Sequence, residues 1–125
     1  MARVMICDDD AEGSERLVAA LRLAGHEAEC SRHTMDVLRW AAEGRFDLIA
    51  VGLDMAGFGR DRAVEALREL SPLTPLIAIH SRPPEIMRSA AHARLAAVLP
   101  RPTRVEDFMY AVARALNEPA MTEPV

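Results

Sequence analysis

A row of aspartates, Asp8 to Asp10, follows a short apolar run near the start of the chain. Asp8 and Asp9 are candidate ligands for a divalent cation, because neighbouring carboxylates repel one another unless a positive charge lies between them. A guanidinium can supply that charge in place of a metal, since its fork of N–H donors suits carboxylates. Arg101 is the candidate for this role, and we expect it to pair with Asp8 or Asp9.

Two other apolar runs end in residues that could do chemistry. Gly52 and Asp54 follow the run 47–51, and His80 and Ser81 follow the run 76–79. Asp54 is a candidate acceptor, His80 a candidate metal ligand, acceptor or pH-sensitive group, and Ser81 a candidate hydroxyl donor. The alternative is that Asp54 is a solvated or capping loop residue and that His80 fills space and bonds a neighbouring carboxylate or carbonyl.

The composition excludes several classes of function. The chain has 125 residues, which fits one domain, and half of them are hydrophobic. Its net charge is −4, and all 15 basic residues are arginines, so we expect no nucleic-acid partner. The two cysteines, Cys7 and Cys30, lack the spacing of a zinc or redox motif and are expected to be buried. No phosphate-binding glycine motif is present.

Nothing in the sequence indicates a membrane protein. The start of the chain is too short and too acidic for a signal peptide. No apolar run approaches the length of a membrane span. We therefore expect a cytoplasmic protein with no membrane partner.

The hydrophobic pattern alternates between short apolar runs and segments of helical periodicity. Strands are expected over 3–7, 26–30, 47–51, 76–79 and 95–99, and helices over 11–24, 34–44, 60–70, 83–94 and 103–116. Asp10, Thr34 and Thr103 are the expected helix caps. The alternation predicts an α/β domain over 1–116, with a parallel sheet covered on both faces, and a flexible tail or linker start over 117–125. In such folds the site lies beyond the carboxyl ends of the strands.

Three motifs, in order and at the expected strand ends, resemble those of the response-regulator receiver domain family. Asp8 and Asp9 match its acidic pair, residues 47–57 follow its pattern D-L-three hydrophobics-D-x-x-M-P-G, and Leu99-Pro100-Arg101-Pro102 lies at its K-P position. The resemblance spans about residues 3–116. It implies a flavodoxin-like, doubly wound (βα)5 fold with five parallel strands in the order 2-1-3-4-5.

The family's chemical positions are changed in this chain. Gly52 lies where the resemblance places the phosphate-accepting aspartate, His80 replaces a Thr or Ser, and Arg101 replaces a lysine. Val98 lies at the position of the switch aromatic, and Ala56 at that of the loop proline. We therefore predict a pseudo-receiver that is not an enzyme. It would serve protein–protein recognition in two-component or phosphorelay signalling without phosphorylation.

Two alternative functions and several partners remain open. Asp54 is the substitute acceptor if the domain is still phosphorylated or metal-switched, and a flavodoxin-like domain that binds a small molecule is the other alternative. No cofactor is expected, and the binding of Mg²⁺ is the alternative with weaker support. The resemblance implies a histidine kinase or another regulator as partner, or a second copy of the chain. Its candidate partner face comprises Met87, Arg88, Ala91, Arg94, Glu106, Met109, Tyr110 and Arg114.

Overall fold

The computed structural model describes the backbone of residues 1–53, 60–81 and 95–121, and the side chains of these residues except 60–63 and 118–121. Its strands are β1 (Arg3–Cys7), β2 (Glu27–Ser31), β3 (Leu48–Gly52), β4 (Leu76–His80) and β5 (Ala97–Pro100). Its helices are α1 (Ala11–Leu23), α2 (Thr34–Glu43), α3 (Arg60–Leu70) and α5 (Val105–Met121). The expected helix 83–94 lies outside the described residues.

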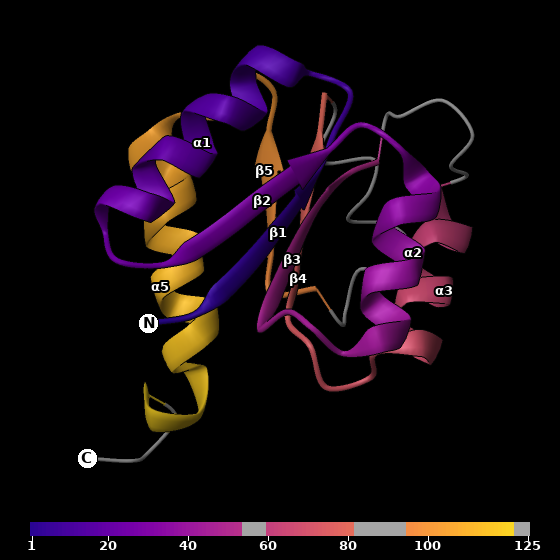
Figure 1. Cartoon of the computed structure of the whole chain (residues 1–125). Coiled ribbons are helices and arrows are strands. Elements are labelled where there is room, and N and C mark those ends of the chain that lie inside the picture. The colour runs from indigo at the N-terminus through magenta and orange to yellow at the C-terminus, as the bar shows by residue number, and fades with distance from the viewer. Residues whose placement is uncertain (54–59, 82–94, 122–125) are drawn as a thin grey trace.

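The five strands form one parallel sheet in the order β2-β1-β3-β4-β5. Figure 1 shows α1 and α5 on one face of the sheet and α2 and α3 on the other. The predicted fold class and strand order are therefore confirmed. A connection between parallel strands is usually a crossover helix, which explains why short apolar runs and helical segments alternate in the sequence.

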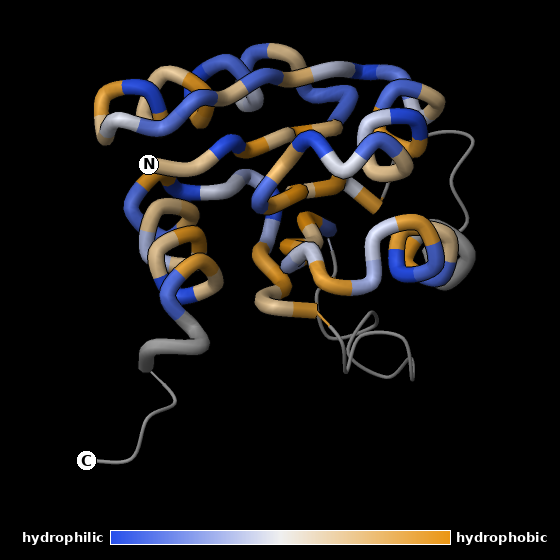
Figure 2. The backbone as a smooth tube through the Cα atoms, turned by 60° about the horizontal axis from the view of Figure 1, so that its bottom comes forward, coloured by the Kyte–Doolittle hydropathy of each residue, from blue (hydrophilic) through white to orange (hydrophobic). Residues whose placement is uncertain are grey.

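A hydrophobic core lies on each side of the sheet. One core packs Met5, Cys7 and Val51 against α2 and α3, and the other packs Val4, Ile6 and Ala50 against α1 and α5. Every residue of β3 and β4 is buried, as expected for central strands covered on both faces. Figure 2 shows hydrophobic residues concentrated along these central strands. The packing of these buried strands in the core therefore holds the residues at their carboxyl ends in place.

Several predicted boundaries differ from the structure. Gly52 and His80 are the last residues of β3 and β4 and do not begin loops, and α5 continues to Met121, past the expected end at 116. The N-cap of α2 is His33, one residue before the predicted Thr34. Cys30 is exposed, because β2 is an edge strand.

The predicted cap at Thr103 is also wrong. Its hydroxyl donates a hydrogen bond to the Pro100 carbonyl at 2.7 Å, and α5 begins two residues later, at Val105. Within the described segments, no helix is both long enough and apolar enough to cross a membrane.

The start of α1, which follows the acidic row, confirms the predicted cap at Asp10. Its carboxylate accepts a hydrogen bond from the backbone N–H of Gly13 at 3.1 Å. A Cβ at position 13 would lie 2.3 Å from Asp10 Oδ2, so the carboxylate could keep its present position only beside a glycine.

We expect Gly13→Ala to leave the stability of the protein nearly unchanged, since the lost cap hydrogen bond costs about 1 kcal/mol and the higher helix propensity of alanine offsets about the same amount. Helix propensity alone predicts a stabilisation of about 1 kcal/mol, because alanine is favoured over glycine inside a helix. Urea unfolding measures the effect. In an Asp10→Ala background the same substitution should become stabilising. A stabilising Gly13→Ala in the parent protein would contradict the role of the cap.

Candidate functional site

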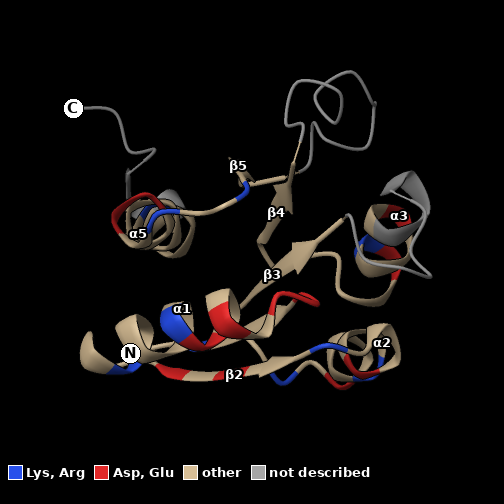
Figure 3. Ribbon diagram, turned by 90° about the horizontal axis from the view of Figure 1, so that it is seen from above, with Lys and Arg blue, Asp and Glu red and all other residues tan. Residues whose placement is uncertain are grey.

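The carboxyl ends of four neighbouring strands bring the predicted site residues together. Asp8 follows β1, Gly52 ends β3, His80 ends β4, and Arg101 follows β5. Asp8 and His80 are buried, with 5% and 7% of their surface exposed. Seen from above in Figure 3, acidic residues follow β1 and a basic segment follows β5. These four residues therefore lie together at the carboxyl ends of the strands, as the sequence predicted.

A short ion pair joins the two sides of this site. Arg101 Nη2 lies 2.7 Å from Asp8 Oδ1, and the two side chains are 19% and 6% exposed. Because β3 and β4 separate β1 from β5 in the sheet, the guanidinium must reach across the ends of both. The predicted pairing of Arg101 with one of the aspartates is present, and Asp8 is the partner.

The Asp8 carboxylate is held in an unfavourable environment in spite of this partner. Burial raises the pKa of Asp8, and the hydrogen bond and charge of Arg101 lower it by less. The net shift is upward from the usual value of 3.8. Arg101 thus offsets only part of the cost of burying the carboxylate.

Gly52 lies directly against this ion pair. A Cβ at this position would lie 2.5 Å from Asp8 Oδ1 and 2.8 Å from Arg101 Nη2. A glycine inside a strand marks a close approach by another group, which here is the ion pair itself. The space that a side chain at position 52 would need is therefore filled by Asp8 and Arg101.

The described residues do not fit the Mg²⁺ site that the family resemblance implies. Mg²⁺ needs near-octahedral oxygen coordination, whereas Asp8 Oδ1 is bonded to a guanidinium and Gly52 has no side-chain oxygen. No group of three His, Cys, Asp or Glu residues suited to a metal occurs in the described parts of the chain. The side chains at this position form an ion pair and not a set of oxygen ligands for a metal.

The remaining predicted site residues are placed as follows. Asp9 and Ser81 are exposed near the ion pair, and Asp54 lies outside the described residues. Of the candidate partner face, Met87, Arg88, Ala91 and Arg94 also lie outside the described residues. On α5, Tyr110 is 65% exposed, Glu106 and Arg114 are exposed, and Met109 packs partly against the core.

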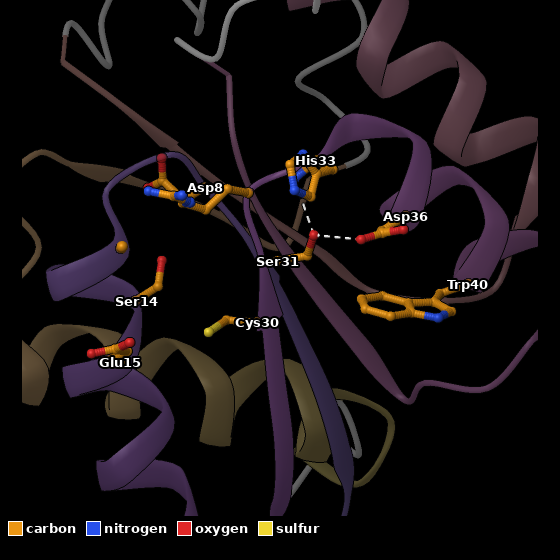
Figure 4. A pocket seen from close by; sticks show the side chains of 10 residues that line it. Asp8, Ser14, Glu15, Cys30, Ser31, His33, Asp36 and Trp40 are labelled. Atoms are coloured by element: carbon orange, nitrogen blue, oxygen red, sulfur yellow. Dashed lines mark hydrogen bonds between the residues drawn. The ribbon is translucent and has the colours of Figure 1, made fainter.

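Sequence reasoning missed a cleft beside the ion pair. A cleft of about 520 Å³ lies at the carboxyl ends of β1 and β2, between α1 and α2, with Asp8 at one end (Figure 4). Trp40 lines it together with Ser14 and Cys30. No motif could have revealed this cleft, because its walls come from three separate elements.

Comparisons with known proteins agree with this architecture. No family model matches the chain. It is 27% identical over 117 residues to the DNA-binding transcriptional regulator NtrC of Azospirillum brasilense, covering 93% of this chain and 24% of that protein. The NtrC of a Bradyrhizobium strain is 25% identical over 117 residues, with the same coverage. The chain thus spans about a quarter of the length of these curated relatives.

Among solved structures, a CheY-like receiver domain protein from Methanospirillum hungatei is similar with a TM-score of 0.86 and 18% identity, covering 98% of this chain and 99% of that one. Chemotaxis response regulator CheY4 of Vibrio cholerae is similar with a TM-score of 0.81 and 24% identity, covering 93% and 99%. The chain therefore has the fold of a CheY-like response-regulator receiver domain. Across 93% of its length the chain is also similar in sequence to part of NtrC.

Proposed function

We propose that this chain is a receiver-like module of a two-component regulator that recognises protein partners without accepting a phosphoryl group. The observation that carries the proposal is the Asp8–Arg101 ion pair, which fills the space beside Gly52. The fold and the likeness to NtrC support the signalling context. Recognition of the partner would then depend on surface shape and charge.

Phosphoryl transfer to a carboxylate needs three things at one place. It needs an ionised nucleophile, a cation that neutralises the phosphoryl oxygens, and room for the phosphoryl group. At the described site the nucleophile position is Gly52, and the one buried carboxylate is engaged by Arg101. These residues supply neither a nucleophile at position 52 nor room for a phosphoryl group, and the guanidinium of Arg101 is already engaged by Asp8.

The exposed part of α5 is the candidate partner face within the described chain. Arg114 Nη1 donates to the Tyr110 hydroxyl at 3.4 Å, and its guanidinium lies 5.9 Å from the Tyr110 ring centroid. Glu106 forms an exposed ion pair with Arg104 at 3.1 Å. Exposed tyrosine and arginine are enriched at protein interfaces. We propose a histidine kinase, another regulator or a second copy of the chain as the partner.

Intact-mass measurement after incubation with acetyl phosphate and Mg²⁺ tests the proposal. We expect no phosphoryl adduct, and a receiver that keeps its acceptor aspartate provides the positive control. An adduct that disappears in Asp54→Ala would establish the displaced acceptor and overturn the proposal. An adduct that persists in this variant would overturn it as well, and would point to another acceptor such as His80.

A further inference from the structure

The loop between α3 and β4 presents a leucine to solvent. Leu73 is 94% exposed, the highest value among the large hydrophobic side chains of the described residues. A single exposed leucine is ordinary on a protein surface. Here, however, Met1 is 92% exposed and lies along the same groove as Leu73. Large hydrophobic side chains exposed together are typical of a docking surface.

A buried arginine holds this loop in one shape. Arg68, 9% exposed, donates through Nη1 to the carbonyl of Pro72 at 3.2 Å and to that of Thr74 at 2.9 Å. These two carbonyls belong to the neighbours of Leu73 in the chain. The backbone N–H of Thr74 also donates to the Ser71 carbonyl at 3.2 Å, and the hydroxyls of these two residues are hydrogen-bonded. Because the backbone is already fixed, little conformational entropy is lost when the leucine is buried against a partner.

A groove of about 670 Å³ lies beside the leucine, at the amino ends of the strands. Helix α5 contributes Ala113 and Leu116 to its wall, and Pro75 lines it directly before β4. Figure 1 shows the N-terminus beside the lower half of α5 at this end of the molecule. The groove therefore lies at the opposite end of the strands from the ion pair.

The polar side chains along this groove are already bonded within the chain. Asp47 Oδ2 accepts from the backbone N–H of Arg3 at 2.8 Å, and His26 Nδ1 accepts from that of Ala2 at 3.0 Å. The Asn117 amide donates to a carbonyl one turn earlier on α5, at 2.9 Å. The described lining residues include one acidic side chain and no arginine. Two copies of a chain with a net charge of −4 repel one another, and this weakly charged face is where they approach at little electrostatic cost.

We propose that this end of the molecule binds a second copy of the chain across a two-fold axis, with Leu73 of each copy seated in the groove of the other. The leucine and the groove lie on one face, as required for a contact in which both copies use the same surface. A short apolar peptide would fill the groove but leave the leucine exposed. A second copy covers both, because it supplies a leucine for the groove and a groove for the leucine.

This contact goes beyond the proposed function and does not depend on it. It uses neither the ion pair beside Gly52 nor the exposed part of α5 around Tyr110. Loss of the contact would leave the proposed lack of phosphorylation unaffected, and the detection of a phosphoryl adduct would leave the contact unaffected.

Analytical ultracentrifugation of the whole chain, from micromolar to millimolar concentration, measures the association. We expect a reversible dimer whose population rises with concentration. Leu73→Asp should weaken it by about tenfold or more, the factor that corresponds to 1.4 kcal/mol, because a carboxylate would be buried in each groove. A parent chain that stays monomeric at millimolar concentration would overturn the proposal and assign the groove to another protein.

Leu23→Asp is the matched control for this substitution. Leu23 is 91% exposed at the end of α1 and does not line the groove. This variant should dimerise as the parent does, and urea unfolding should show both variants folded, since neither side chain is buried in the single chain. Equal weakening in the two variants would contradict the assignment. Loss of the dimer in Tyr110→Ala, with Leu73→Asp unaffected, would move the contact to the exposed part of α5 and overturn it as well.

Cysteine cross-linking tests the two-fold arrangement. The background is Cys30→Ser, which removes the exposed native thiol, while Cys7 is buried. Leu73→Cys and Ala113→Cys are prepared separately in this background, mixed and oxidised. We expect a disulfide between the two different variants, because position 73 of one copy faces α5 of the other. Disulfides formed only within one variant would show another arrangement and overturn the proposal.

Discussion

Arg101→Met is expected to lower the free energy of unfolding by about 3 kcal/mol at neutral pH. The substitution removes the partner of a carboxylate whose side chain is 6% exposed and leaves a buried charge unpaired. Breaking a buried ion pair costs about 3–5 kcal/mol, and the lower value applies here because the Arg101 side chain is itself 19% exposed. Urea unfolding followed by circular dichroism gives the difference.

The pH dependence of this loss has a definite sign. The pKa of Asp8 in the folded protein is raised above its usual 3.8, so the folded state binds a proton more readily than the unfolded state does. The stability contributed by protonated Asp8 is fully present below 3.8 and is lost as the pH rises through the folded-state pKa. Without Arg101 that pKa rises further. The deficit of Arg101→Met should therefore be largest at pH 7 and shrink on acidification.

Two controls make this prediction sharp. Arg104→Met removes an ion pair whose side chains are 70% and 71% exposed, and it should change stability little. Asp8→Asn in the Arg101→Met background should recover most of the loss, because no buried charge remains. A deficit that stays constant from pH 7 to pH 4, or that persists in the double variant, would show that Arg101 acts through packing alone.

The α/β class and the approximate strand ends were predictable because the hydrophobic pattern is a local property of the sequence, whereas the strand order came from the resemblance to receiver domains. The sequence could not predict whether Asp8 or Asp9 pairs with Arg101, since neighbouring residues at the end of a strand point to opposite faces. A shift of one residue in the end of β1 exchanges the two side chains. In the structure Asp8 is buried and Asp9 is exposed. The same uncertainty of one residue separates His33 from the predicted cap at Thr34.

The cleft was unpredictable for a different reason. Ser14, Cys30 and Trp40 are far apart in the sequence and belong to three elements. Each also has an ordinary local explanation, as a helix residue, an edge-strand residue and partial core cover. Only the packing of α1 and α2 around the end of β2 brings them together. Local patterns cannot supply that geometry.

Gly52→Asp, which introduces the aspartate that the resemblance to receiver domains places at this position, is expected to destabilise the protein by about 2–3 kcal/mol without making it a phosphoryl acceptor. The new Cβ would lie 2.5 Å from Asp8 Oδ1, so the ion pair must move, and the new carboxylate would then lie beside another. Gly52→Ala separates these effects, because it keeps the steric conflict and omits the charge. It should cost less than Gly52→Asp. If Gly52→Asp stabilised the protein, the side chains of Asp8 and Arg101 could move aside without a cost in stability.

Combining Gly52→Asp with Arg101→Lys should create a dependence of stability on Mg²⁺ that we do not expect in the parent chain. Lysine lacks the guanidinium fork that engages Asp8, so carboxylates at positions 8, 9 and 52 would repel one another unless a hard cation lies among them. Thermal unfolding with and without millimolar Mg²⁺ measures the effect. The double variant should gain stability with Mg²⁺, whereas the parent and Gly52→Ala/Arg101→Lys should not. Mg²⁺ stabilisation of the parent, or sub-millimolar binding by calorimetry, would show that Arg101 does not replace the metal.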